Sequence, residues 1–454
     1  MKSKKQYLAP VPAIPKILPS KILKGKSTGF VHLEKIKGAW WLIDHEGNAF
    51  WDLGMSMVGY PAPGSWYSKM NHKYAETIVK KYPEPEEWAK IIWEMLDNLG
   101  FTSLYAGCDA TLKETRKRGK FFYVLLMLSR NHGGNWKDDF YLRDAYGRLP
   151  ADSATRFPDP FNAEWREYAR GVAKEAVSKY KDDKTLIGYF IDNEIVASGD
   201  RNLFKYFWSE YCLREMLSWI RKRYKNSIEA LNKAWLTAIP SFDEISREIL
   251  RLVEFPHFRT PQAHKDLVDF ERFVVETYVD FTLNLMRELD PNHLIIGNRF
   301  AGSFTYMEWE PFDLFGKYDL VAVNFYPFKG PFLSKEELKR IKTFHKLTGK
   351  PIIMSEFNFS SRETRRIKWV WGYTVNTHRE RAEGYKNFIA QVSALPYVVG
   401  AHWFQLVDAF DVEDYNAGLL QENGEPYPLL ADAMRETNRK AVHSKRGTVG
   451  KSRK

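Results

Sequence analysis

The chain has 454 residues, of which 44% are hydrophobic and 28% charged, a composition typical of a globular protein. It contains two cysteines, Cys108 and Cys212, which are too few for a disulfide framework or for a zinc or iron–sulfur site built on cysteines. The net charge of +11 would suit a nucleic-acid-binding protein, but its distribution along the chain does not.

The excess positive charge lies at the two ends of the sequence. Residues 1–26 and 438–454 hold seven basic residues each and no acidic ones, so the chain between them carries a net charge of −3. We therefore expect basic flexible tails at 1–28 and 438–454, on either side of a single domain at 29–437. Weak binding of RNA by the tails stays open, but nucleic acid is not the expected main partner.

The sequence does not predict a membrane protein. No apolar run approaches the roughly 18 residues that are needed to cross a bilayer. Pro10, Pro12 and Pro15 interrupt the apolar part of the N-terminus, which also lacks a clear signal-peptide cleavage site. We expect a cytoplasmic protein, and its few glutamines and many charged residues suggest a thermophilic source.

Short apolar runs alternate with longer helical patterns along the chain. Residues 31–44, with a turn at 44–48, are expected to form a hairpin that covers the N-terminal face of the domain. Strands are expected at 49–57, 100–107, 121–129, 186–194, 293–298, 320–326, 351–357 and 397–404. Helices are expected at 84–98, 161–180, 203–224, 227–236, 270–289, 335–348 and 380–395. This series predicts an α/β fold, a single (β/α)8 TIM barrel, in which the long connection 130–160 belongs to the functional face.

Two of the expected strands end in carboxylates. Glu194 ends the fourth strand and Glu356 lies near the end of the seventh. These strands are three apart in a ring of eight, and the C-terminal strand ends of a barrel converge on its active site, so the two side chains should face each other. A pair of facing carboxylates is what glycoside hydrolysis requires. The alternative is that both are ordinary acids at the solvent boundary. Asp192 points the same way one layer deeper and is expected to be a buried structural acid.

At this point the sequence resembles the retaining glycoside hydrolases of clan A, and within that clan the β-galactosidases and β-agarases of families 42 and 50. The segments that carry the resemblance are 38–47, Asp192-Asn193-Glu194, 227–235, 290–299, Ser355-Glu356-Phe357 and 400–405. The likeness covers most of residues 30–430. Its two-glutamate signature is specific for the clan and not for the sugar.

The resemblance implies roles for five residues. Glu194 would be the acid/base and Glu356 the nucleophile. Asn193 would bind the 2-hydroxyl of the sugar, Tyr326 would orient Glu356, and Trp403 would form the floor beneath the reacting sugar. Such enzymes use no cofactor.

The sequence also departs from the family pattern. Most clan members place an arginine near the end of the second strand, and this chain has none there; Arg299 is the candidate substitute, with a purely structural ion pair as the alternative. The zinc-binding cysteine cluster of many family 42 enzymes is absent. His132, His378 and His402 form no metal-binding pattern with acids, so we expect no catalytic metal.

Aromatic residues make up 15% of the chain, and 15 of them are tryptophans. Flat aromatic faces suit the apolar faces of sugars, although a large aromatic core would need them too. Trp66, Trp136, Trp309 and Trp371 lie in expected loops after barrel strands, where they could line sugar subsites or pack their own loops. Cys108 is expected to be an inert buried thiol.

These observations predict a retaining β-glycosidase that hydrolyses β-linked oligosaccharides, most simply as an exo-acting β-galactosidase-like enzyme. A β-glucosidase, a β-mannosidase and an agarase-like endo-hydrolase stay open as alternatives. A different class, a catalytically inactive carbohydrate-binding barrel, is less consistent with the presence of both glutamates. The sequence does not predict the oligomeric state.

Overall fold

The structure is a computed structural model. It describes residues 23–105, 107–115, 119–129, 137–149, 156–195, 206–245, 260–302, 310–364, 372–412 and 416–451. Most of the expected N-terminal tail, residues 1–22, lies outside these ranges.

Eight strands form a closed barrel in the order β10-β13-β4-β5-β6-β7-β8-β9. The strands are β4 (Asp52–Met55), β5 (Ser103–Leu104), β6 (Phe121–Leu126), β7 (Leu186–Ile191), β8 (Leu294–Ala301), β9 (Leu320–Asn324), β10 (Ile352–Phe357) and β13 (Val398–Trp403). Each overlaps one of the eight predicted runs, although β8 extends three residues beyond its run, and nearly all of their residues are buried. Parallel strands covered on both faces account for these unbroken apolar runs. The predicted (β/α)8 barrel is confirmed.

The chain divides into two compact units, residues 1–122 with 358–454 and residues 123–357. The first unit contains a three-stranded antiparallel sheet, β1-β2-β3. Its strands are β1 (His32–Ile36), β2 (Ala39–Ile43) and β3 (Ala49–Phe50). The backbone NH of Trp40 donates to the carbonyl of Pro396 at 2.7 Å, just before β13 begins, so this sheet lies at the N-terminal end of that strand.

The predicted hairpin is present, but its turn was misplaced. The chain reverses between β1 and β2 at Lys37 and Gly38, both of which have positive φ angles. The turn predicted at 44–48 instead connects β2 to β3, where Asp44 Oδ1 accepts hydrogen bonds from the backbone of Glu46 and Asn48. The aspartate side chain makes this second turn conspicuous in the sequence, whereas the Lys-Gly turn is short and carries little signal.

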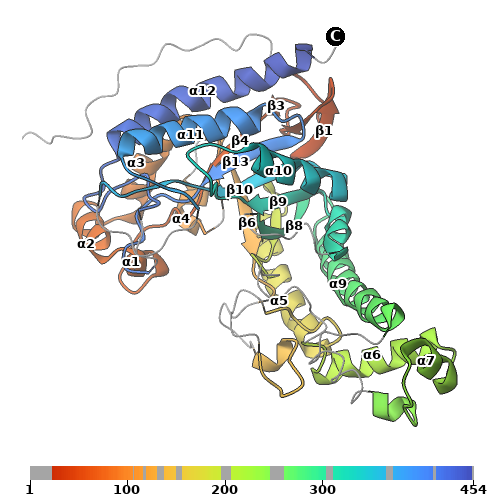
Figure 1. Cartoon of the computed structure of the whole chain (residues 1–454). Helices are drawn as coiled ribbons and strands as arrows, with labels where there is room; N and C mark the ends of the chain where they lie inside the picture. Colours follow the sequence, from red (N-terminus) through yellow and green to blue (C-terminus); the bar gives the residue numbers. More distant parts are fainter. Residues whose placement is uncertain are drawn as a thin grey trace, which may run out of the picture. The chain divides into compact units, whose positions relative to one another are not determined.

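The helices of the first unit are α1 (Trp66–Met70), α2 (His72–Lys81), α3 (Pro85–Asn98), α4 (Ala110–Glu114), α11 (His378–Ser393) and α12 (Pro428–Lys451). Helices α11 and α12 lie side by side (Figure 1). Met434, Asn438 and Ala441 are buried on α12 at helical spacing. Asn438 accepts a hydrogen bond from Tyr385 on α11 and donates one to the carbonyl of Leu99.

The boundary predicted at residue 437 therefore falls inside a helix. Residues 438–451 continue α12 and are not an irregular tail. The many basic residues suggested a flexible tail, but they do not exclude a helix with one buried face. Asn438 and Ala441 are buried on that face, while Lys440, between them in the sequence, is exposed. No helix in the described part of the chain is apolar over a long enough stretch to span a bilayer.

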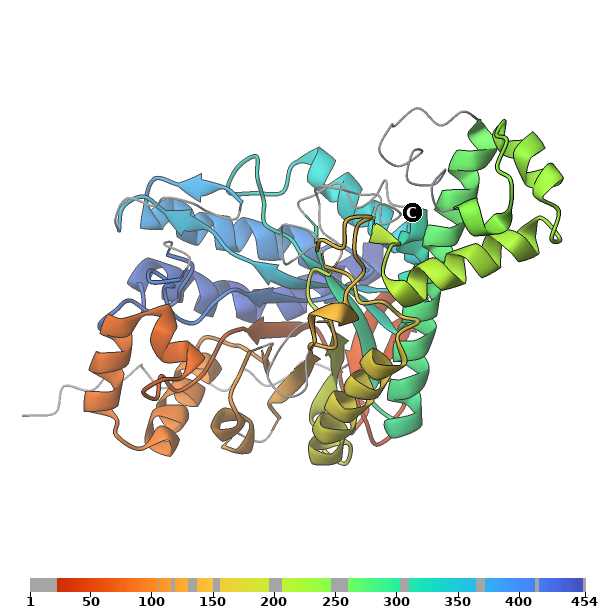
Figure 2. The same ribbon diagram turned by 90° about the horizontal axis from the view of Figure 1, so that it is seen from below.

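The helices of the second unit are α5 (Ala163–Tyr180), α6 (Glu210–Arg223), α7 (Ile228–Trp235), α9 (Pro261–Leu289) and α10 (Lys335–Thr348). Short 3-10 helices lie at Asp138–Phe140, Phe242–Glu244 and Glu310–Lys317. Helix α9 begins nine residues before the predicted start, at a Pro that follows a capping threonine: Thr260 Oγ1 accepts a hydrogen bond from the NH of Ala263 at 3.1 Å. Helices α6 and α7 pack against the N-terminal part of this long helix (Figure 2).

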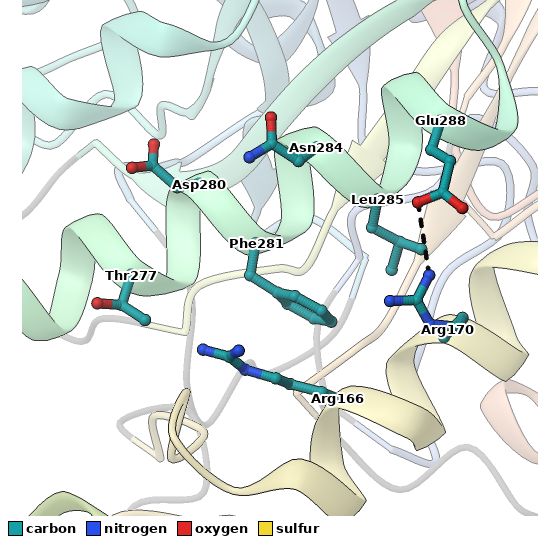
Figure 3. Close-up of a pocket in the computed structure, with 8 residues that line it drawn as sticks. All are labelled: Arg166, Arg170, Thr277, Asp280, Phe281, Asn284, Leu285 and Glu288. Atoms are coloured by element: carbon teal, nitrogen blue, oxygen red, sulfur yellow. Dashed lines mark ion pairs between the residues drawn. The ribbon is translucent and has the colours of Figure 1, made fainter. Parts of the chain in front are cut away.

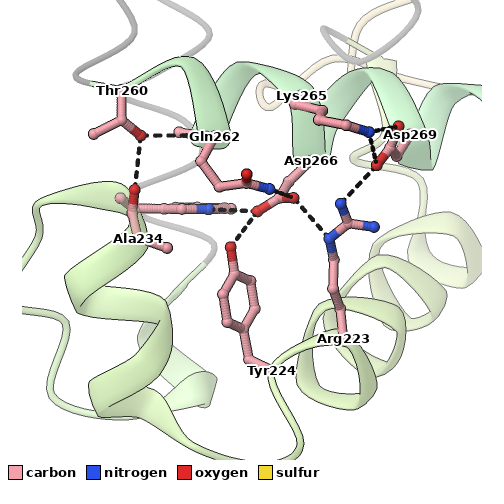
Figure 4. A network of polar contacts seen from close by, with 10 residues as sticks. Arg223, Tyr224, Ala234, Thr260, Gln262, Lys265, Asp266 and Asp269 are labelled. Carbon is pink, nitrogen blue, oxygen red and sulfur yellow. Dashed lines mark hydrogen bonds and ion pairs between the residues drawn. The ribbon is translucent and has the colours of Figure 1, made fainter.

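A buried carboxylate joins these three helices (Figure 4). Asp266 on α9 is 1% exposed. It accepts hydrogen bonds from Tyr224 Oη and, at 2.7 Å, from Trp235 Nε1 and Gln262 Nε2, and it pairs with Arg223 Nε at 2.7 Å. A buried charge is stable only when it is paired and hydrogen-bonded in this way.

This network predicts that Asp266 is a major contributor to stability. Asp266→Ala removes the acceptor of four donors, so it should lower the free energy of unfolding by about 3–5 kcal/mol. Asp269→Ala is the matched control, because the more exposed Asp269 pairs with Lys265 and Arg223 and should cost at most about 1 kcal/mol. Equal denaturation midpoints for the two variants in guanidinium chloride would contradict the assignment.

Candidate active site

The end of β7 is bent by backbone contacts with both neighbouring strands. The NH of Asp192 donates to the carbonyl of Leu126 at 2.7 Å, and the NH of Glu194 donates to the carbonyl of Arg299 at 3.0 Å. Asp192 and Glu194 have φ angles of 65° and 53°, in the left-handed region that side chains normally avoid. Such strain persists only where the surroundings hold it, and it is concentrated at functional sites.

Asp192 is the structural acid that the sequence predicts. It is fully buried, and its carboxylate accepts hydrogen bonds from the NH of Ser129 at 2.8 Å and from Tyr278 Oη at 2.6 Å. Burial and the neighbouring carboxylate raise the pKa of Tyr278 well above its usual value, so its phenol keeps the proton that it donates. Asp192 thereby fixes the bend, and Asn193 and Glu194 that follow are half-exposed.

Glu356 on β10 is held through both carboxylate oxygens. Oε1 pairs with the guanidinium of Arg299, and Oε2 accepts a hydrogen bond from Tyr326 Oη. Glu356 is 8% exposed and Arg299 is 3% exposed, so the pair is nearly buried. The expected contact between Tyr326 and Glu356 is present. Arg299 is the cation that pairs with this carboxylate.

Irregular pairing of the strands precedes both members of this ion pair. The register of β8 against β9 shifts between Ile296 and Arg299, and that of β10 against β9 shifts between Met354 and Glu356. A bulge changes the direction in which the following side chain points. The two shifts are therefore the local backbone features that aim Arg299 and Glu356.

Asn324, at the end of β9, was missed by the sequence analysis. Its Nδ2 donates to Glu194 Oε1 at 2.8 Å and to Asn193 Oδ1 at 3.1 Å, and its Oδ1 accepts a hydrogen bond from Ser355 Oγ at 2.7 Å. The available signal was its position two residues before Tyr326, because residues i and i+2 of a strand point to the same side.

The other expected site residues are less directly placed. Trp403 is completely buried in the first unit. The centroid of its ring lies 5.5 Å from Cζ of Arg381 and 5.6 Å from the ring centroid of Tyr385. Its role as the sugar floor stays a prediction. Trp66 begins α1 and is 55% exposed. Trp136, Trp309 and Trp371 lie outside the described residues.

Neither a reactive cysteine nor a metal site is supported among the described residues. Burial raises the pKa of Cys108 to about 12, which keeps this thiol neutral, as expected for an inert residue. Across the described ranges, no group of three or more His, Cys, Asp and Glu side chains could hold a metal ion.

A groove of about 410 Å³ lies between α5 and α9 (Figure 3). The guanidinium of Arg166 lies 5.2 Å from the ring of Phe281, and Arg170 pairs with Glu288 at 3.6 Å. The groove is lined by Arg166, Arg170, Thr277, Asp280, Phe281, Asn284, Leu285 and Glu288. None of the residues expected at the active site lines this groove, so the candidate site is the strand ends of β7–β10.

Comparison with known proteins decides the family. The model of glycoside hydrolase family 42, described as beta-galactosidase, matches residues 137–426, a range that contains Glu194, Glu356 and Trp403. The chain belongs to this family. The resemblance to family 42 that the sequence indicates is thus confirmed.

Relatives of this family 42 chain include both agarases and galactosidases. Beta-agarase B of Vibrio sp. (strain JT0107) is 23% identical over 91% of this chain and 48% of its own length. A beta-galactosidase of Arthrobacter sp is 28% identical over 36% of this chain and 24% of its own. The chain therefore spans about half the length of the curated agarases that it matches.

Solved structures show the same fold. The crystal structure of an agarase has a TM-score of 0.74 at 19% identity and covers 93% of this chain and 66% of its own. A beta-galactosidase from the Antarctic haloarchaeon Halorubrum lacusprofundi has a TM-score of 0.57 at 16% identity, with 86% and 58% covered. At these identities the likeness concerns the fold alone.

Proposed function

We propose that this family 42 chain is a retaining β-glycosidase, with Glu356 as the nucleophile and Glu194 as the acid/base. The observation that carries the proposal is the difference between the surroundings of the two carboxyl groups. Glu356 is paired with the Arg299 cation, which suits a group that must attack as an anion. Glu194 accepts a hydrogen bond from the neutral amide of Asn324, which suits a group that must alternate between acid and carboxylate.

In the first step, a carboxylate oxygen of Glu356 forms a bond to the anomeric carbon while the glycosidic bond breaks. Glu194 gives its proton to the departing oxygen, and a covalent glycosyl-enzyme remains. In the second step, Glu194, now a carboxylate, takes a proton from water as the water oxygen attacks the same carbon. Glu356 is released as a carboxylate, and the sugar leaves with its original configuration.

We propose β-linked oligosaccharides as substrates. An exo-acting β-galactosidase is supported by the description of the family and by the galactosidases among the relatives. An agarase-like endo-hydrolase is the second candidate, because the agarase relatives match far more of this chain. Nitrophenyl β-galactosides, β-glucosides and β-mannosides, assayed beside agarose oligosaccharides, distinguish these substrates. No turnover of any of them would favour an inactive carbohydrate-binding barrel.

Glu356→Ala tests the nucleophile. The variant should lose turnover, and added azide should restore it by attacking the anomeric carbon in the space left by the carboxylate, giving an α-glycosyl azide that NMR identifies. Glu337→Ala is the control: Glu337 is fully buried but caps α10, where it accepts bonds from Ser334 and Phe328. This control should lose stability and keep turnover without azide. Wild-type activity in Glu356→Ala would rule out the assigned role.

Glu194→Ala tests the acid/base. General acid catalysis contributes about 10²–10⁴-fold in rate, so substrates with poor leaving groups should lose activity on this scale. Dinitrophenyl glycosides should lose far less in the glycosylation step, because their leaving group departs without a proton. The measurement is kcat/KM over a series of aryl glycosides. Losses of equal size across the series would count against this role.

A further inference from the structure

Both the nitrogen and the oxygen of the Asn324 amide are hydrogen-bonded within the site. Asn324 is 1% exposed. An asparagine amide has two donor hydrogens on nitrogen and an acceptor oxygen. Here Nδ2 donates to Glu194 and to Asn193, and Oδ1 accepts from Ser355. The side chain thus joins the end of β7 to β10.

Ser355 determines which way this amide faces. Its side chain is fully buried, and it lies beside Glu356 at the register shift of β10. Because the Ser355 hydroxyl donates to Oδ1 at 2.7 Å, the oxygen end of the amide is turned toward β10 and the nitrogen end toward Glu194. The strand that carries the nucleophile therefore also orients the contact with the acid/base.

The amide contact distinguishes the two oxygens of Glu194. Oε1 receives the hydrogen bond from Asn324 at 2.8 Å. A protonated carboxyl group carries its hydrogen on one oxygen, and the other, carbonyl-like oxygen is the better acceptor. When Glu194 is protonated, the hydrogen bond to Oε1 therefore favours the proton on Oε2.

We propose that Asn324 is a positioning residue that fixes Oε2 of Glu194 as the oxygen that delivers the proton, and that Ser355 sets its orientation. This inference rests on the proposed glycosidase function. The second hydrogen bond of the same amide, to Asn193 Oδ1 at 3.1 Å, helps to hold the Asn324 side chain in this orientation.

The test is the dependence of activity on the leaving group. For Asn324→Ala, substrates with poor leaving groups should lose roughly 10²-fold in kcat/KM, the size of loss that a small misplacement of a catalytic group causes. Glycosides with good leaving groups should keep most of the wild-type rate and KM. Ser355→Ala should show the same pattern with a smaller loss.

Asn324→Asp separates positioning from packing. The aspartate has nearly the same shape and can still accept from Ser355, but it presents an oxygen to Glu194 in place of the N–H donor. It should therefore show the same selective loss as Asn324→Ala, even if the alanine variant folds poorly. Asn162→Ala is the control, because Asn162 is also buried but caps α5 through the NH of Glu164. It should lower stability without changing the leaving-group dependence.

The outcomes separate this inference from the function on which it rests. Turnover by the wild type with equal losses on all leaving groups in the Asn324 variants would overturn the positioning role alone. A wild type that hydrolyses no β-glycoside overturns the proposed function and this inference with it. A loss confined to poor leaving groups, in both Asn324→Ala and Asn324→Asp, supports the inference.

Discussion

The ion pair between Arg299 and Glu356 is the interaction on which the rest of the site depends. An unpaired carboxylate at this depth would cost several kcal/mol, and removal of one partner of such a pair leaves that cost uncompensated. The pair links β8 to β10 across β9, and each partner follows a shift in strand register. The register shifts among these three strands thus lie directly before the two residues that form this one ion pair.

Two groups of hydrogen bonds lie at these strand ends, one around Glu356 and one around Asn324. Tyr326 and Asn324 lie on the same side of the end of β9, and one contacts Glu356 while the other contacts Glu194. Ser355 joins Asn324 to β10, the strand of Glu356. Within each group the hydrogen bonds hold the carboxyl group in place, because each bond limits the orientation of the next. Rigid placement of both carboxyl groups is what a two-step displacement requires.

Much of this arrangement follows from local patterns in the sequence. Strands covered on both faces read as unbroken apolar runs, and these located all eight barrel strands. Polar residues at the ends of such runs, Glu194 and Glu356 above all, then indicated the candidate site. Arg299 came from the family resemblance, as the candidate substitute for the arginine that most clan members place near the end of the second strand and that this chain lacks.

The remainder depended on tertiary contacts that the sequence does not reveal. Asn324 is an ordinary strand residue until the register of β9 brings it against Glu194 and Ser355. The basic segment after residue 437 has the composition of a tail, yet Asn438 and Ala441 bury one face of α12. Trp403 has the residue type of a sugar platform, but its burial is set by the packing of Arg381 and Tyr385.

The central claim is that Glu356 forms a covalent bond to the sugar. Dinitrophenyl 2-deoxy-2-fluoro-β-glycosides of galactose, glucose and mannose test this directly, because the fluorine slows release of the intermediate. Mass spectrometry of the digested protein should locate one added sugar on the peptide that contains Glu356, with the label absent from Glu356→Gln. Turnover of the parent glycosides with the label on another residue, or with no label and an inverted product, would contradict the account.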